Sequence, residues 1–537
     1  QNYYFSLQNN LDSSISGYTN LASNTANSEA GWTPIGNFST KFTGNFDGLG
    51  HSVSNLSINQ VSSDYMGLFG SSYNAKIQNL DLLNIDIIGK NNVGGLIGYA
   101  NNTEIKNATV TGSIKGTNQY TGGLLGEAEG TNIYDTTVSG SIVGHDQYTG
   151  GLIGRAINTH IENTTTAGTV SGYQQVGGLV GEMMDSAATV LNSSSSARVS
   201  GSDNVGGLIG KLLYSKIENS YATGKVESVN SSIGNIGGLV GYATSSLIDQ
   251  SYASGNVNGT DSTGGLVGKT FRTDIKNSYA KGDVSGSFHV GGIVGDLSSD
   301  STISNSYALT QNLSGSMMIG GLVGMNGDNT FSNVTNSYWD TDISEEESSK
   351  GGLGKTSAEL KELVTFSDTG WDIQEDDTLD SSTPFLAWEK DGNSYTKVWV
   401  IGTKVASKGG GTTTPTNPTN PTTQKEIDKV VTTIVNKEAV KVPNIPKVTK
   451  TPNNAGKNVN VAFNIGENKQ IVSKPIEGQA TKRVTLSEAK QMQQDATGQT
   501  VGEVRVPLSR SSIIQLVDGG VSLPNGVEQE FYVADNK

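Results

Sequence analysis

A five-residue segment, two glycines followed by two aliphatic residues and a third glycine, recurs along this 537-residue chain. Its first glycines are Gly94, Gly122, Gly150, Gly177, Gly206, Gly237, Gly264, Gly291 and Gly320. Successive copies are 28, 28, 27, 29, 31, 27, 27 and 29 residues apart, and a degenerate copy lies at Met66 to Gly70. A period of this length indicates an array of one repeated supersecondary unit.

A second pattern keeps the same period, because a hydrophobic residue is followed two places later by asparagine, as in Ile217 and Asn219. Asparagines at equivalent places of stacked units bond side chain to side chain and tolerate the left-handed conformation of corners. We therefore expect a structural ladder that contains Asn107, Asn163, Asn192, Asn219, Asn277 and Asn305.

These patterns predict three short strands per repeat, because each segment alternates with period two. A coil of this kind cannot bury its apolar face alone, so coils must stack and pair in register. No proline lies between Pro34 and Pro384, as expected where nearly every backbone amide donates to a ladder. The expected fold is all-β, a parallel right-handed β-helix of about 10 to 11 coils and roughly 50 Å, capped at both ends.

The composition fits a secreted, fibrous protein, since charged residues make up only 16% and 69 residues are glycine. Cysteine is absent, which excludes thiol catalysis, zinc-thiolate sites and disulfides. No run of about 18 apolar residues exists, so no membrane span is expected. The net charge of −15 argues against nucleic acid as a partner.

Five sections follow one another along the chain. Residues 1–60 are expected to form an entry section and N-terminal cap, residues 61–340 the solenoid, and residues 341–403 a C-terminal cap with a short helix. Tryptophan returns in that cap, where large aromatic side chains cover the open end of the core. The glycine-, threonine- and proline-rich linker at 404–423 precedes a C-terminal tail at 424–537. We expect most of residues 424–500 to be weakly ordered, with a small β unit near 500–537.

The repeat resembles the GLUG motif, a glycine-leucine-hydrophobic-glycine segment, over residues 67–324. Together with Trp32 to Gly36, Phe42 to His51, Asn336 to Asp340 and Pro384 to Trp388, it resembles the repeat section of filamentous-haemagglutinin-like exoproteins of two-partner secretion systems. The end of the chain, from Val506 onward, resembles the C-terminus of such exoproteins. The resemblance implies a bacterial adhesin, secreted or at the cell surface, with roles in attachment and biofilm formation. It also implies that the tail engages an outer-membrane transporter.

Tyrosines supply the candidate ligand contacts. Tyr120 and Tyr148 occupy matched loops before the glycines and are expected to be exposed. A column in the last coils, two places after the asparagine position, is able to stack on sugars but is favoured as an internal aromatic ladder. Its members are Tyr221, Tyr252, Tyr279, Tyr307 and Tyr338.

Acidic residues offer two weaker hypotheses. Calcium ligands are present among Asp340, Asp342, Asp372, Asp376 and Asp377, although their spacing matches no defined loop and a solvated acidic cap is favoured. No other cofactor or metal is expected. The closest carboxylate pairs of the coils, Asp81 with Asp86 and Glu127 with Glu129, are interpreted as solvated turns.

The sequence thus predicts a non-enzymatic adhesin, a stiff solenoid that presents rows of side chains to carbohydrate or to another cell surface. Two alternatives stay open. A β-helix polysaccharide lyase or glycoside hydrolase needs convergent carboxylates in a groove. A purely structural stalk needs no binding site on the coils.

Overall fold

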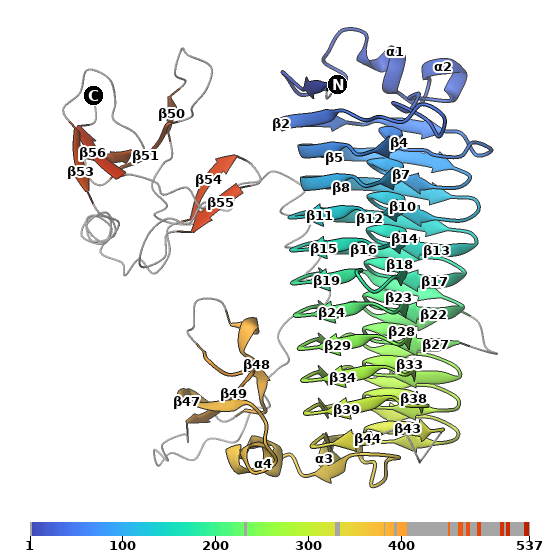
Figure 1. Ribbon diagram of the computed structural model, residues 1–537, viewed down its shortest axis with the longest axis vertical. Coiled ribbons are helices and arrows are strands. Elements are labelled where there is room, and N and C mark those ends of the chain that lie inside the picture. Colours follow the sequence, from blue (N-terminus) through green and yellow to red (C-terminus); the bar gives the residue numbers. More distant parts are fainter. Residues whose placement is uncertain are drawn as a thin grey trace, which may run out of the picture. The chain divides into compact units, whose positions relative to one another are not determined.

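The computed structural model describes residues 3–229, 234–327, 333–380, 382–390 and 395–404, and seven strands farther along the chain. The chain divides into two compact units, residues 1–407 and 408–537. The first unit is dominated by a stack of parallel strands (Figure 1). No helix in the described ranges is long and apolar enough to cross a membrane.

Two sheets of the stack take one strand from each coil. One sheet contains β4 (Phe69–Tyr73), β7 (Ile97–Asn101), β10 (Leu125–Glu129), β14 (Ile153–Ile157), β18 (Val180–Met184), β23 (Ile209–Leu213), β28 (Val240–Thr244), β33 (Val267–Phe271), β38 (Val294–Ser298) and β43 (Val323–Asn326). The other contains β6 (Val93–Gly94), β9 (Thr121–Gly122), β13 (Gln147–Gly150), β17 (Gln174–Gly177), β22 (Asp203–Gly206), β27 (Asn235–Gly237), β32 (Ser262–Gly264), β37 (Val290–Gly291) and β42 (Ile319–Gly320). All their pairings are parallel and in register.

The third sheet forms the remaining sides of each coil. In its N-terminal half it contains β1 (Tyr4–Ser6), β2 (Asn45–Ser54), β3 (Ser57–Asn59), β5 (Lys76–Gly89), β8 (Glu104–Gly116), β11 (Asn132–Tyr134), β12 (Thr137–Gly144), β15 (His160–Glu162), β16 (Thr165–Ser171), β19 (Thr189–Leu191), β20 (Ser194–Ser195) and β21 (Arg198–Gly201). It continues with β24 (Lys216–Glu218), β25 (Tyr221–Ala222), β26 (Val226–Ser228), β29 (Leu247–Asp249), β30 (Tyr252–Ala253), β31 (Val257–Asn258), β34 (Asp274–Lys276), β35 (Tyr279–Ala280), β36 (Val284–Ser285), β39 (Thr302–Ser304), β40 (Tyr307–Ala308), β41 (Leu313–Ser314), β44 (Asn333–Thr335), β45 (Tyr338–Asp340) and β46 (Leu353–Lys355).

The parallel β-solenoid predicted from the repeat is confirmed, and it has about 12 turns. The number of turns exceeds the 10 to 11 expected, because the stacked strands begin before residue 61 and continue beyond residue 340. At the start, β2 already pairs with β5, and at the end β45 pairs with β46. Two short helices, α1 (Tyr18–Ala22) and α2 (Ala26–Glu29), precede the first coils, and the hydroxyl of Tyr18 donates to the carbonyl of Ser54 at 2.8 Å.

The repeated glycines allow a close approach of neighbouring backbones. A Cβ atom at Gly237 would lie 2.0 Å from the carbonyl oxygen of Val240 and 2.7 Å from the amide nitrogen of Gly268 in the next coil. No side chain fits in that space, so the repeat requires glycine here for steric reasons.

The interior consists of columns of one side-chain type. Equivalent aliphatic residues stack without solvent contact, as Ile217, Ile248 and Ile275 do. Beside them runs a column of buried hydroxyls, and each one from Ser193 onward accepts a hydrogen bond from the backbone amide of the preceding coil's member. This hydroxyl column contains Thr164, Ser193, Ser220, Ser251, Ser278, Ser306 and Ser337.

Each coil turns a corner at the predicted asparagine position. The backbone there is left-handed, with φ of 49° at Asn219 and 46° at Asn277. One left-handed residue shifts the inward and outward alternation by one place. Ser220 and Ala222 therefore point inward and have no exposed surface, whereas Tyr221 points outward and is half-buried.

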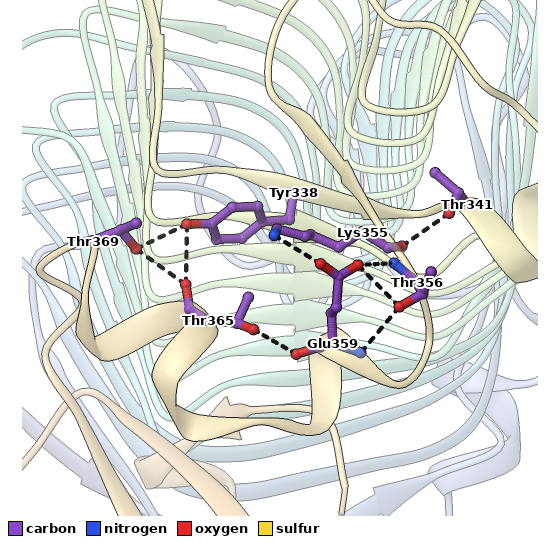
Figure 2. Close-up of polar contacts among 7 residues, drawn as sticks. All are labelled: Tyr338, Thr341, Lys355, Thr356, Glu359, Thr365 and Thr369. Carbon is purple, nitrogen blue, oxygen red and sulfur yellow. Dashed lines mark hydrogen bonds and ion pairs between the residues drawn. The ribbon is translucent and has the colours of Figure 1, made fainter.

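The C-terminal cap continues from the last coil through α3 (Thr341–Ser344), a 3₁₀ turn at Glu359–Lys361, α4 (Leu363–Ser367), β47 (Ile373–Asp380), β48 (Phe385–Leu386), a second 3₁₀ turn at Ala387–Glu389 and β49 (Trp399–Lys404). The side chains of Thr356 and Glu359 exchange hydrogen bonds with each other's backbone amides at 2.8 and 3.2 Å, which is a capping box. Figure 2 shows that box and, beside it, the hydroxyl of Tyr338 bonded to Thr369 at 2.8 Å. The cap thus contacts the side of the last coils as well as their end.

The second unit is described only as strands. Five of them, β50 (Thr449–Thr451), β51 (Asn460–Asn464), β52 (Lys469–Val472), β53 (Thr481–Val484) and β56 (Phe531–Asp535), form an antiparallel sheet. The strands β54 (Arg505–Ser509) and β55 (Ser512–Gln515) form a hairpin. The β structure of this unit therefore begins well before the expected residue 500. Beyond Lys404, the linker predicted at 404–423 lies outside the described residues.

We predict that Ser251→Ala destabilises the solenoid by about 1 to 3 kcal/mol, because the buried amide of Ser220 loses its acceptor at 3.3 Å. The midpoint of urea unfolding measures this effect. The control is Ser316→Ala, at an exposed position, which should leave the midpoint unchanged. Equal midpoints for the two variants would contradict the role of the hydroxyl column.

We also predict that Trp399→Ala loosens the cap. The Trp399 side chain has no exposed surface and contacts Tyr279, Tyr307 and Trp371, so its truncation should cost about 3 to 5 kcal/mol. Limited proteolysis should then cut within residues 341–404 faster than in the parent protein. The solenoid's far-ultraviolet circular dichroism should persist, because its core is a separate cluster. An unchanged cleavage rate would refute this prediction.

Candidate functional site

The tyrosine column of the last coils is stacked as its spacing predicts, but it lies outside the solenoid core. Neighbouring rings of Tyr221, Tyr252 and Tyr279 are parallel within 6°, with centroids 4.9 and 4.8 Å apart. Trp388 stacks on the first two of these rings, and Trp399 covers the following ones. The internal aromatic ladder was the wrong interpretation, because the left-handed corner turns the column outward.

The cap also removes most of this column from the candidate ligand contacts. Tyr279 and Tyr307 are at most 1% exposed, and their hydroxyls bond to Glu389 and to the carbonyl of Pro384 in the cap. Tyr221 and Tyr252 are half-buried under Trp388. The prediction that these four tyrosines contact a ligand is therefore wrong for Tyr279 and Tyr307.

The tyrosines of the matched loops remain accessible. Tyr120 and Tyr148 are half-buried rather than fully exposed, and they stack on each other with ring centroids 5.2 Å apart and planes 8° apart. Both lie at a corner beside the short-stranded sheet, where their φ angles are 63° and 67°. A bulky residue with positive φ is an outlier, and such strain concentrates at functional positions. The same corner is held by Asn92 and Asn204 at φ of 52° and 49°, which is ordinary for asparagine, and by Gln175 and Met318 at 49° and 51°.

Three further aromatic residues extend this surface toward the N-terminus. Phe38 stacks on Tyr65 with centroids 5.3 Å apart, and Tyr99 lies 6.3 Å from Phe38 and 6.5 Å from Tyr65. Phe38 is 53% exposed, and Tyr65 shares the corner position with a φ of 63°. We call these five residues, Phe38, Tyr65, Tyr99, Tyr120 and Tyr148, the aromatic patch.

Arg155 connects the two tyrosines of the patch to a row of charges on β10, β14, β18 and β23. Its guanidinium carbon lies 5.9 Å from the centroid of Tyr120 and 5.7 Å from that of Tyr148, so it lies alongside the pair. Its nitrogens lie 3.4 Å from carboxylate oxygens of Glu127 and of Glu182. The Glu182 side chain, 4% exposed, also pairs with Lys211 at 3.2 Å. Charges of opposite sign thus alternate from coil to coil along this face.

The sequence analysis interpreted Glu127 and Glu129 as part of a solvated turn. That interpretation is wrong, because both residues lie on the outer face of β10. The Glu127 carboxylate accepts a hydrogen bond from the side-chain amide of Asn92 at 2.8 Å. Oε2 of Glu129 accepts from the hydroxyl of Tyr99 at 2.7 Å and from Asn101 at 2.9 Å. The other pair, Asp81 and Asp86, lies within β5.

The asparagine positions lie at surface corners. Asn107 donates to the Asn79 side chain at 2.8 Å, while Asn163 and Asn277 donate to Asp135 and Asp249 at 3.2 and 2.9 Å. No such side-chain pair is present for Asn192, Asn219 or Asn305 among the described residues. The ladder is therefore interrupted, and the buried hydroxyl column provides the continuous polar contact that the sequence analysis missed.

The acidic residues considered for calcium accept other hydrogen bonds. Asp340 caps α3 and accepts from Ser357, and Asp342 accepts from the amide of Ser357. Asp372 pairs with Lys397 at 2.7 Å, and Asp376 accepts from Tyr395. Among the described residues, Asp377 included, no group of three or more His, Cys, Asp or Glu side chains lies close enough together to hold a metal ion.

We predict that Arg155→Met destabilises the solenoid by about 1 to 3 kcal/mol, because Glu127 and the buried Glu182 lose their shared cation. Arg198→Met is the control, since the exposed pair of Arg198 and Glu227 should contribute at most about 1 kcal/mol. Thermal unfolding of both variants measures the difference. Equal losses would contradict a structural role for the charge row.

Comparisons with known proteins bear on this repeat. Residues 89–115, 201–227, 232–258 and 259–285 match the family model described as the GLUG motif. A segment of 72 residues is 42% identical to halomucin of Haloquadratum walsbyi, and it covers 13% of this chain and 1% of halomucin. No solved structure matches the chain significantly. These matches show that the chain contains GLUG repeats within its solenoid.

Proposed function

We propose that this protein is an extracellular adhesin whose solenoid binds carbohydrate through the aromatic patch. The GLUG repeats and the stacked coils support an extracellular repeat protein of this kind. Stacking holds equivalent side chains at fixed spacing, and such a row suits repeated weak contacts that gain affinity through multivalency.

The observation that carries the proposal is the left-handed backbone of Tyr65, Tyr120 and Tyr148. Asparagine forms the same corner without strain, so tyrosine at three such corners favours a role for the rings themselves. One exposed and four half-buried aromatic rings beside carboxylates and an arginine offer both apolar contact and hydrogen bonds to the hydroxyl groups of a sugar.

We propose further that this surface binds without catalysis. Glycoside hydrolysis needs one carboxyl group that donates a proton and another that acts as base or nucleophile. Here Glu127 and Glu182 are both paired with the guanidinium of Arg155, and the Glu182 side chain is buried, so this carboxylate pair does not face a bound sugar freely.

The finer assignment rests on the resemblance to filamentous-haemagglutinin-like exoproteins. It would place the protein at a bacterial surface, with a role in attachment and biofilm formation. The second unit, which contains the exoprotein-like segment from Val506 onward, would contact an outer-membrane transporter. The alternative is a purely structural stalk, which would bind no glycan through its coils.

The test is a glycan-array screen of the full chain and of the double variant Tyr120→Asn, Tyr148→Asn. Asparagine keeps the corner conformation, so unfolding should be unchanged while glycan binding falls by at least about tenfold, which corresponds to about 1.4 kcal/mol. Tyr214→Asn is the matched control, because Tyr214 is 59% exposed and has a φ of 53° at a different corner. Identical glycan profiles for all three proteins would refute the proposal.

A further inference from the structure

We infer that the aromatic patch selects sugars that carry free amino groups and rejects acidic sugars. This inference rests on the proposed carbohydrate binding and names the chemical class of its ligand. The reason is that the cation of the patch is already paired with carboxylates, whereas an acceptor atom of one carboxylate is available to a ligand.

Negative charge predominates at the patch. Five carboxylates, those of Asp64, Glu127, Glu129, Asp146 and Glu182, act on its tyrosine rings. Three cations oppose them, since Arg155 and Lys211 pair with these acids and Lys41 lies over Phe38 at 4.6 Å.

The tyrosine hydroxyls respond to this environment. Burial, with nearby carboxylates adding to it, raises the pKa of Tyr65, of Tyr148 and of Tyr99, the last to about 12. The three phenols therefore stay neutral at physiological pH. The field that opposes their ionisation attracts a cationic ligand for the same reason.

The arginine of the patch is already paired with two carboxylates, while its buried Nε atom has no hydrogen-bond partner among the described residues. Arg155 has one carboxylate on each side along the stack and two aromatic rings beside it. An acidic sugar would have to displace Glu127 or Glu182 from it, and would leave a carboxylate of the protein without its cation. Such an exchange costs desolvation energy and supplies no new attraction.

The hydrogen-bonding atom that the patch offers to a ligand is an acceptor. The Oε2 atom of Glu129 accepts two hydrogen bonds, whereas its Oε1 atom has no partner among the described residues. This side chain is exposed and lies beside the hydroxyl of Tyr99, 2.7 Å away. An ammonium group of a sugar carries three donors and fits an exposed carboxylate next to aromatic rings.

The experiment measures binding of the full chain to three oligosaccharides of equal length by isothermal titration calorimetry. They are a glucosamine oligomer with free amines, its N-acetylated neutral counterpart and a uronic acid oligomer. We expect the glucosamine oligomer to bind about two- to fivefold more tightly than the neutral one, because one weak ion pair supplies up to about 1 kcal/mol, which is about fivefold in affinity. The uronic acid oligomer should not bind, and added salt should reduce the preference for amines.

Two variants assign the preference to the patch. Glu129→Gln should weaken binding of the glucosamine oligomer about two- to fivefold and leave the neutral oligomer unaffected. Glu347→Gln, at an exposed position of the cap, is the matched control and should change neither. Polylysine is tested as a competitor in the parent protein and in the Tyr120→Asn, Tyr148→Asn variant.

The outcomes separate this inference from the proposed function. Tyrosine-dependent binding that is equally strong for the uronic acid oligomer, or insensitive to Glu129→Gln, would overturn the amine preference and preserve carbohydrate binding. Amine binding that survives loss of both tyrosines and is competed by polylysine would show mere charge attraction, and would overturn the inference. Loss of tyrosine-dependent binding to every glycan would overturn the proposed function itself.

Discussion

The hydrogen bond between equivalent backbone groups of successive coils is the interaction on which the whole solenoid depends. The amides of Leu96, Leu124 and Leu152 each donate to the leucine carbonyl of the next coil, at 2.9, 2.8 and 2.8 Å. In-register pairing of this kind places each side chain about 4.8 Å above its counterpart. Each side chain therefore contacts the side chain at the equivalent position of the next repeat, which is of the same type or of a type that replaces it there.

This constraint favours some residues at a repeated position and excludes others. Aliphatic chains and hydroxyls stack on their own kind, as the isoleucine and serine columns do. Charges do not, because like charges directly opposite each other repel. The row from Glu127 through Arg155 and Glu182 to Lys211 solves the problem by alternating sign, and Lys269 with Asp296 repeats the solution farther on.

The repeat period and the alternation of apolar residues were sufficient to predict the parallel solenoid and its buried aliphatic columns. They were insufficient at the corners, because period-two alternation fails wherever one residue adopts positive φ. Asn219 was identified as a corner residue, yet its effect on the following residues was missed. That shift exposes Tyr221 to the outside, and the cap then covers the continuation of its column through long-range contacts that no local pattern encodes.

The aromatic patch illustrates the same limit for a binding site. Tyr120 and Tyr148 were found because they precede consecutive copies of the glycine segment, and Tyr65 holds that position before the degenerate copy. Phe38 and Tyr99 carry no such signal, since one comes from the entry section and the other from the middle of β7. Only stacking brings them together. A solenoid can thus assemble a site from residues far apart in the sequence, because the register of its coils already fixes which side chains meet.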